Sequence, residues 1–433
     1  MERVLPKANF VFSVRPLYYV SRVLGLGLFS FTDSFVVKEI NTLWILYTVI
    51  LLIAVLTCGV YCTVQRVGQS GLLATIVVNE FLMMFIGALK AVSSIFISVA
   101  MNGAKSRKFI STVVKVDRSL LSDPITTYRK TFIFTLVQVF AVYSYEATLF
   151  TYDTWVWTRA MGSLSIWYFI SGYPHRIVNI GGVLQFCDIV LLLRSRFQAL
   201  NSGLGFILKD SVDPSIVFTN VAHESASSSV VMRNENSVSE DKSVTIIPFR
   251  DSSQFMVNRI RQPRFKILKQ KNVHDFREIY DDLCDISVLI NSMYGFQLLL
   301  ELGVTTFELI LSSYLMLATI LGIHNVETDT ISQFISLMTA WLLQYAFKLI
   351  SITAPCHSAT TEAENTAVLV QKLLLVPNFD HDTVAELQLF SQQLLQRKIK
   401  FTAFGFLILD YSLLFTIIGG VTTFLVVAMQ YSN

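Results

Sequence analysis

The chain has 433 residues, of which 53% are hydrophobic and 15% are charged, and it contains 33 phenylalanines. This composition excludes an ordinary soluble domain and is typical of a chain that crosses a membrane several times. The formal net charge of +3 is small, and we expect no nucleic-acid polymer as a partner.

We interpret residues 1–40 as a cytoplasmic N-terminal segment. A moderately apolar stretch near its start is interrupted by Arg15, Pro16 and Arg22. A cleaved signal peptide needs a short, uninterrupted apolar core followed by a small-residue cleavage site. We therefore expect no removed leader here.

Seven stretches are long and apolar enough to cross a hydrocarbon core about 30 Å thick, which takes roughly 20 helical residues. The first four spans lie within residues 41–193, and the fifth and sixth lie within residues 290–354. The seventh span and a short extracellular tail make up residues 411–433. The predicted spans are Asn41–Tyr61, Leu72–Ala100, Thr131–Thr151, Leu164–Leu193, Ile290–Leu321, Ile331–Ala354 and Tyr411–Gln430.

Positive charge is sorted between the two sides of these spans. Of 34 Lys and Arg residues, 29 fall in the N-terminal segment and in the loops after the second, fourth and sixth spans. Loops rich in Lys and Arg stay in the cytoplasm. The chain is therefore predicted to be all-α and polytopic, with a cytoplasmic N-terminus and an extracellular C-terminus. This is opposite to the orientation of a G-protein-coupled receptor.

The largest cytoplasmic segment, residues 194–289, contains a Ser-rich, polar insert at about 209–263. Its composition predicts disorder. Phosphorylation at Ser237 or Ser239 and a plain flexible linker are two interpretations of this insert. The flanks, Arg194–Ile207 and Phe265–Ser287, regain helical character and are expected to extend the neighbouring spans into the cytoplasm.

Residues 355–410 are predicted to form cytoplasmic anchor helices, His357–Val376 and Thr383–Phe401, on either side of a Pro-Asn-Phe-Asp turn. Thr383-Val-Ala-Glu386 has the form of a capping box. An apolar stripe on the second helix needs a partner, which is either the same chain or another subunit; its members are Val384, Leu387, Phe390, Leu394 and Ile399.

One face of the last span is poor in large side chains. Small and hydroxyl-bearing residues serve either close helix packing or the lining of a water-filled path. The stripe consists of Thr416, Gly420, Thr423, Val427 and Gln430. Tyr431 at the outer end can form a constriction with Gln430, and a ring of Asp410 carboxylates would concentrate cations at the inner mouth of a symmetric assembly.

These residues resemble a known family. Thr423-Phe-Leu-Val-Val-Ala-Met-Gln430-Tyr431 is similar to the Thr-Tyr, five hydrophobics, Gln-Phe signature of insect gustatory receptors, with the two aromatics exchanged. The stretch from Arg397 to Asp410 resembles the segment before the family's last helix, with Phe404 where Cys or Ala is more usual. Arg15-Pro-Leu-Tyr-Tyr-Val-Ser, Arg194-Ser-Arg-Phe-Gln-Ala-Leu-Asn and Asp281-Asp-Leu-Cys-Asp resemble the gustatory receptor 28 subfamily most.

The resemblance implies a ligand-gated, non-selective cation channel of four subunits, each contributing its seventh helix to a central pore. It implies a plasma-membrane location in sensory dendrites, a small tastant (a bitter compound, nucleoside or sugar) and assembly alone or with other gustatory receptors. Gln430 and Tyr431 fall at the family's outer gate. The resemblance also favours the oligomer interpretation of the anchor stripe.

Polar and aromatic groups in the outer halves of spans three to six are candidates for a ligand site, because small ligands need ring faces and a few oriented polar groups. Trp341 aligns with a pocket tryptophan of fructose-type receptors when counted back from Pro355-Cys-His. The other candidates are Tyr145, Trp167, Tyr168, Tyr173, His175, Arg176, Tyr314 and Gln344. Ordinary interhelical packing is the alternative for each aromatic.

Charges inside the spans need partners or a route to water. Arg176 is expected to pair with Glu80, Glu146 or Glu308, and ligand contact is its second interpretation. Lys90 and Lys348 are expected to extend towards the cytoplasmic surface.

The sequence gives little support for an enzyme or for another class of membrane protein. No catalytic, metal-ligand or complete nucleotide-binding pattern occurs, so we predict neither an enzyme nor a cofactor or metal site. A seven-helix receptor that signals through G proteins, and a membrane transporter, remain as alternatives to the channel.

Overall fold

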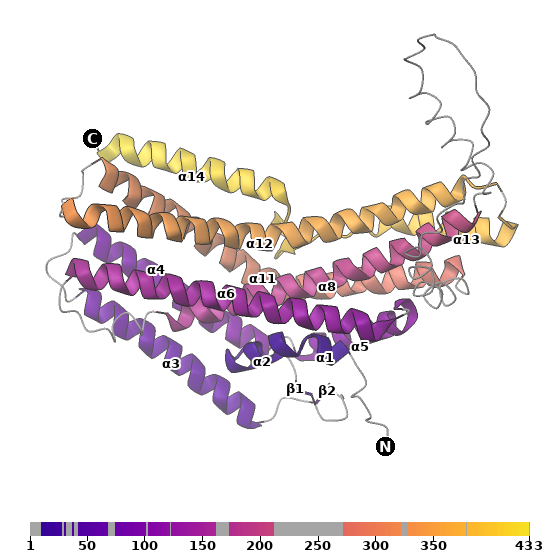
Figure 1. Ribbon diagram of the computed structural model, residues 1–433, viewed down its shortest axis with the longest axis horizontal. Helices are drawn as coiled ribbons and strands as arrows, with labels where there is room; N and C mark the ends of the chain where they lie inside the picture. Colours follow the sequence, from indigo (N-terminus) through magenta and orange to yellow (C-terminus); the bar gives the residue numbers. More distant parts are fainter. Residues whose placement is uncertain are drawn as a thin grey trace, which may run out of the picture.

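The computed structural model describes residues 10–27, 30–31, 37–38, 42–67, 74–100, 103–121, 123–161, 173–211, 272–321, 328–377 and 379–432. Nearly all of these are helical and run roughly along the long axis of the molecule (Figure 1). The long helices are α3 (Thr42–Val67), α4 (Ala74–Ala100), α5 (Gly103–Leu120), α6 (Pro124–Met161), α8 (Pro174–Ser211), α11 (Val273–Ile320), α12 (Thr328–Leu374) and α14 (Tyr411–Ser432).

The shorter elements precede, connect or flank these long helices. They are α1 (Phe10–Ser13), α2 (Arg15–Val23), α13 (His381–Gln396) and two antiparallel hairpins. Strand β1 (Ser30–Phe31) pairs with β2 (Val37–Lys38), and β3 (Thr402–Ala403) pairs with β4 (Leu407–Ile408). These two-residue strands leave the predicted all-α class unchanged.

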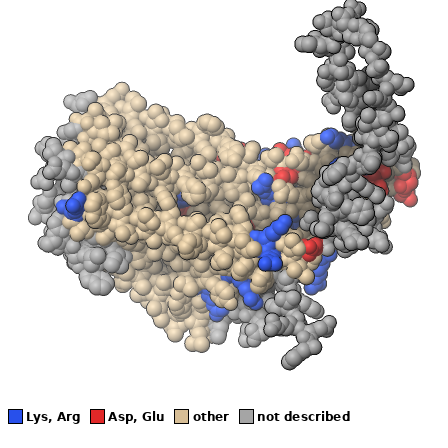
Figure 2. Space-filling model, viewed as in Figure 1, with Lys and Arg blue, Asp and Glu red and all other residues tan. Residues whose placement is uncertain are grey.

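Helices dominate because a bilayer offers no water to the backbone, so each spanning segment must satisfy its own peptide groups. Among the described residues, six helices are long and apolar enough to cross a membrane, and a seventh is counted when the bent pair α4 and α5 is taken as one span. Charged side chains gather at the end of the molecule that holds α13, and most of the remaining visible surface is uncharged (Figure 2). The predicted polytopic fold is confirmed.

Several helices extend beyond the predicted spans. Helix α8 runs on to Ser211 and α11 begins at Val273, which confirms helical extensions on both sides of the Ser-rich insert. Residues 212–271, which include most of the predicted disordered insert, lie outside the described residues.

The boundary at residue 355 is not a helix end. Helix α12 continues through Pro355 to Leu374 and joins the sixth span to the first predicted anchor helix. Proline has no N–H to donate to the carbonyl four residues earlier. Here that carbonyl, of Ser351, accepts a hydrogen bond from the Cys187 thiol of α8 at 2.9 Å.

The second anchor helix differs from the prediction at both ends. Its N-cap is Asp380, whose carboxylate accepts from the Thr383 backbone N–H at 3.3 Å, so the predicted capping box headed by Thr383 is wrong. Hydrogen bonds from Thr383 lower the pKa of Asp380. The helix ends at Gln396 rather than Phe401, because the chain then enters the β3–β4 hairpin, whose turn has positive φ at Phe404 and Gly405.

The apolar stripe of α13 packs inside its own chain. Leu387 and Phe390 are fully buried, and Phe390 meets the Tyr280 ring of α11 edge to face at 5.7 Å. Four of the five members of the stripe, all except Val384, belong to the largest apolar cluster of the described residues, which is shared with α5, α8, α11 and α12. The oligomer interpretation is therefore wrong for this stripe.

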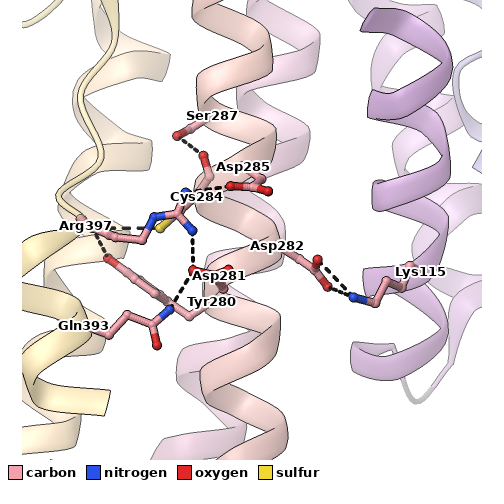
Figure 3. Close-up of polar contacts among 9 residues, drawn as sticks. All are labelled: Lys115, Tyr280, Asp281, Asp282, Cys284, Asp285, Ser287, Gln393 and Arg397. Carbon is pink, nitrogen blue, oxygen red and sulfur yellow. Dashed lines mark hydrogen bonds and ion pairs between the residues drawn. The ribbon is translucent and has the colours of Figure 1, made fainter. Parts of the chain in front are cut away.

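Arg397, directly after α13, connects two of the motifs on which the family resemblance rests (Figure 3). Its guanidinium forms ion pairs with Asp281 and Asp285 of α11, the latter at 2.6 Å. Its carbonyl accepts from the Tyr280 hydroxyl at 3.1 Å. These contacts fix the point from which the chain turns into the β3–β4 hairpin and α14.

The hairpin itself lies close to α11. A Cβ atom at Gly295 would come within 3.0 Å of the Phe404 backbone nitrogen, so this close approach requires glycine. At the start of α14, the Tyr411 ring lies 4.5 Å from the His357 ring of α12, centroid to centroid. The base of α14 is thus held by both α11 and α12.

A buried ion pair joins α5 to α8. The Arg196 guanidinium donates to both carboxylate oxygens of Asp117 at 2.9 Å, and the Tyr128 hydroxyl donates to the same carboxylate at 2.8 Å. Both charged side chains are 2% exposed. By contrast, the Lys115 to Asp282 pair at 2.8 Å has a lysine side chain that is 64% exposed (Figure 3).

We predict that Asp117→Asn destabilises the folded protein by about 3 kcal/mol or more, because it leaves the buried Arg196 charge uncompensated. Lys115→Met, which breaks the exposed pair, should cost less than about 1 kcal/mol. Thermal unfolding of the two purified variants in detergent tests the difference. Equal losses of thermal stability would contradict it.

Candidate functional site

Helix α14 begins with a cap at Asp410. The carboxylate accepts from the backbone N–H of Ser412 at 3.0 Å and from its hydroxyl at 2.5 Å. The Ser412 hydroxyl contributes most to lowering the pKa of Asp410, so the group is ionised at neutral pH. The predicted inner-mouth carboxylate therefore also closes the first turn of the helix.

The small-residue stripe of α14 faces away from the rest of its own chain. All five members are exposed: Thr416, Gly420, Thr423, Val427 and Gln430. The Thr416 and Thr423 hydroxyls donate to carbonyls of their own helix at 3.1 and 2.9 Å. Helix α14 includes Tyr431, whose side chain lies outside the described part of the structure.

The opposite face of α14 packs on α11 and α12. Leu413 and Ile417 are buried there, whereas Phe415 and Ile418 on a third flank are 76% and 61% exposed. Only 11% of the apolar window of α14 is buried in the single chain, against 67% for α8. Most of α14 is thus available to lipid or to other subunits.

Three predicted ligand residues meet around Trp341 of α12. The Arg176 guanidinium carbon lies over the Trp341 ring at 4.3 Å from its centroid. The Trp341 indole N–H donates to the Asp153 carboxylate at 3.0 Å, and the Tyr173 hydroxyl donates to the same carboxylate at 2.9 Å. We call Asp153, Tyr173, Arg176 and Trp341 the aromatic cluster.

The cluster continues through stacked rings. Phe150 of α6 stacks on Tyr173 at 4.2 Å between centroids, and Trp341 stacks on Tyr345 at 5.9 Å. Gln344, one turn further along α12, donates to Glu146 of α6. Helices α6, α8 and α12 thus converge on one group of rings with a carboxylate and a guanidinium, an arrangement suited to a small ligand with polar and aromatic parts.

The other residues predicted to bind the ligand lie outside the aromatic cluster. The His175 ring is buried against α4, where a Cβ atom at Gly87 would come within 2.6 Å of it. Tyr145 is 44% exposed on the surface of α6, and Tyr314 is half-buried on α11. Trp167 and Tyr168 lie outside the described residues.

Arg176 has acidic neighbours that only partly match the prediction. It interacts electrostatically with Glu308, as expected, and also with Asp153, which the sequence analysis missed. Glu146 also interacts electrostatically with Arg176, and it accepts a hydrogen bond from Gln344. The side chain of Glu80 is outside the described part of the chain.

The expectation for Lys90 and Lys348 is wrong. Both ammonium groups are buried and pair with Glu301 of α11, at 2.7 and 3.1 Å, and Lys348 also lies 3.7 Å from Glu308. The Lys348 ammonium is 5.7 Å from the Tyr345 ring centroid, next to the aromatic cluster. A carboxylate within reach makes pairing inside the bundle cheaper than stretching to the interface. We call Lys90, Glu301, Glu308 and Lys348 the charge network.

No metal or cofactor is indicated by this geometry. In the part of the chain that the structure describes, no three His, Cys, Asp or Glu side chains converge as metal ligands would. The polar groups of the aromatic cluster are engaged with one another.

The comparisons with known proteins agree with this architecture. A family model of 7tm chemosensory receptors matches residues 14–432. Gustatory receptor 28b of Drosophila melanogaster is 28% identical over 37% of this chain, and gustatory receptor 28a is 27% identical over 60%. These matches span 34% and 54% of the two relatives' own lengths.

A solved structure shares the fold. The insect olfactory receptor OR5 from Machilis hrabei superposes with a TM-score of 0.61 at 11% identity, over 96% of this chain and 97% of that one. The structure of OR5 in complex with eugenol matches equally well. The resemblance to gustatory receptors, and to the gustatory receptor 28 subfamily in particular, is confirmed. The chain belongs to the 7tm chemosensory receptor family, as a multi-pass membrane receptor and not an enzyme.

Proposed function

We propose that this chain forms a ligand-gated, non-selective cation channel, a homotetramer in the plasma membrane of taste-neuron dendrites, with α14 of each subunit lining a central pore. The observation that carries the proposal is the exposed stripe on α14. A helix with hydroxyls and an amide along one face, turned away from its own bundle, needs either partner helices or water on that face. Four copies arranged around an axis would supply partner helices beside this face and a water-filled pore in front of it.

The two ends of α14 suit different tasks. Asp410 remains ionised at the end that adjoins the charged anchor, where a ring of carboxylates would attract cations. Gln430 and Tyr431 would form the outer constriction. A hydroxyl at residue 431 makes a closed gate easier to wet, since gating by dewetting depends on an apolar lining.

The aromatic cluster is the proposed stimulus site. The neighbour OR5 was solved in complex with eugenol, and the rings of Trp341 and Tyr173 suit small organic molecules such as bitter compounds, nucleosides or sugars. A ligand between α6, α8 and α12 would shift these helices against α11. Since α11 and α12 both hold the base of α14, the shift would draw the four pore helices apart.

The main alternatives are a receptor that signals through G proteins and a transporter. The sorted positive charge favours a cytoplasmic N-terminus and an extracellular C-terminus. Antibody access to epitope tags on intact cells distinguishes the first alternative, because the channel requires an accessible C-terminal tag. Unitary currents in membrane patches distinguish the second.

For the pore we predict that Gln430→Ala and Tyr431→Ala change conductance or gating when the chain is expressed alone. Tyr431→Phe should lower the resting leak, because it removes a hydroxyl from the constriction. The matched control is Tyr411→Phe at the other end of the same helix, which should leave the leak unchanged. Unaltered currents in all three variants at residues 430 and 431 would refute the pore assignment.

For the stimulus site we predict that Trp341→Ala raises the half-maximal concentration of an activating ligand by at least about 30-fold, the effect of losing an aromatic anchor worth 2 kcal/mol. Trp341→Phe should fall in between, since it keeps a ring and loses the indole N–H. Trp155→Ala, at a tryptophan of α6 that is 45% exposed, is the control. Concentration–response currents to sugars, nucleosides and alkaloids provide the measurement, with surface biotinylation to confirm expression. An unchanged half-maximal concentration for Trp341→Ala would place the stimulus site elsewhere.

A further inference from the structure

Helix α12 carries an ionisable side chain at the base of the proposed pore helix. His357 is exposed, and its ring lies 4.5 Å from the Tyr411 ring in the first turn of α14, centroid to centroid. The carboxylate of Asp410, the residue before Tyr411, interacts electrostatically with the same imidazole. The pore proposed above uses this carboxylate and assigns no task to the histidine.

Asp410 is fixed both in position and in charge. Its carboxylate accepts from the backbone N–H groups of Ser412 and Leu413 at 3.0 and 3.4 Å, as an N-cap side chain does. The hydrogen bonds from Ser412, above all from its hydroxyl, lower the pKa of Asp410. The carboxylate therefore stays ionised between pH 5 and 8, where histidine side chains gain and lose their charge.

Three of the elements at the base of α14 bring no charge to it. Helix α11 has no Asp, Glu, Lys, Arg or His between Asp285 and Glu301. The β3–β4 hairpin has none over residues 401–409, and α14 has none over 411–432. The titratable groups that these elements do bring are the phenols of Tyr294 and Tyr411, and phenols are neutral below about pH 9.

The charged side chains on the other neighbouring elements do not titrate near neutral pH. Those on α8, on α12 and in the segment after α13 are strong bases or carboxylates: Arg194, Arg196, Glu362, Glu364, Lys398 and Lys400. The thiol of Cys356, next to the histidine, is fully buried, and buried thiols stay neutral. Among the described groups around the base of α14, His357 is thus the one whose charge follows pH between 5 and 8.

We propose that His357 sets the charge of the inner mouth through Asp410, so that protons in the cytoplasm lower the cation conductance of the open channel. A neutral imidazole leaves the carboxylate free to attract cations. An imidazolium beside it offsets its charge and lowers the local cation concentration. The inference rests on the proposed channel and gives its inner mouth a sensor of cytoplasmic pH.

The test records unitary currents in inside-out patches from cells that express the full chain alone. Spontaneous openings are used, so no ligand is needed. The solution on the cytoplasmic face is changed from about pH 8 to about pH 6 at constant ionic strength. We expect the unitary conductance to fall about twofold, and to fall less at high salt, because salt screens exposed charges.

Variants assign the effect to the pair. His357→Gln cannot gain a proton and should keep the high conductance at both pH values, whereas His357→Lys should give the low conductance at both. Asp410→Asn retains a good N-cap and loses the charge, so its conductance should be low and independent of pH. The matched control is His381→Gln, at the exposed first residue of α13, which should keep the full pH response.

Each failure points to a different conclusion. Equal unitary conductance at both pH values, or a full pH response in His357→Gln, would overturn the role of His357 and leave the channel in place. A full response in Asp410→Asn would also overturn the proposal, because the histidine would then act without the carboxylate. Absence of unitary currents would refute the channel itself, and this inference with it.

Discussion

The structure depends on the pairing of charges that have no access to water. Glu301 of α11 receives Lys90 of α4 and Lys348 of α12, and all three side chains are nearly inaccessible. Burying one such ion alone would be prohibitive, whereas a carboxylate shared by two ammonium groups is tolerated. These contacts specify which helices neighbour α11. Arg196 and Asp117 impose the same constraint between α8 and α5.

Around this fixed centre, the helices differ in how much of their surface the chain itself covers. Helix α8 is the most enclosed of the candidate spans, and α14 the least. Helix α14 is secured at its first turn by His357, and the hairpin before it lies against Gly295. Such an element is well suited to move, because few contacts within the subunit oppose its displacement.

Much of the architecture could be predicted because its causes are local. The length of an apolar stretch and the charge of a loop can both be read from a short piece of sequence, and they were enough to predict the spans. Trp341 was selected from its distance to a short motif, and its role in ligand binding stays a prediction. Asp153 and Glu301 were missed, because whether a carboxylate faces a cation on another helix depends on packing that no single segment encodes. Candidates such as Tyr145 and Tyr173 differ by the side of the helix on which they emerge, which depends on the neighbours.

The errors at the anchor have the same origin. Pro355 and the Pro-Asn-Phe-Asp turn both suggested breaks, yet only the second ends a helix. Helix α12 continues through Pro355 because α8 supplies a replacement donor. The β3–β4 hairpin was not foreseen, because its turn places Phe404, a bulky residue, at positive φ, which is uncommon for such a side chain.

The bond from Cys187 to Ser351 affects how the protein can be labelled. Spectroscopic studies of membrane receptors usually begin by removing native cysteines, and alanine is the habitual replacement. At residue 187 alanine would leave the proline-exposed carbonyl of α12 without a donor inside the bilayer. Serine keeps a donor and is the safer background for attaching probes.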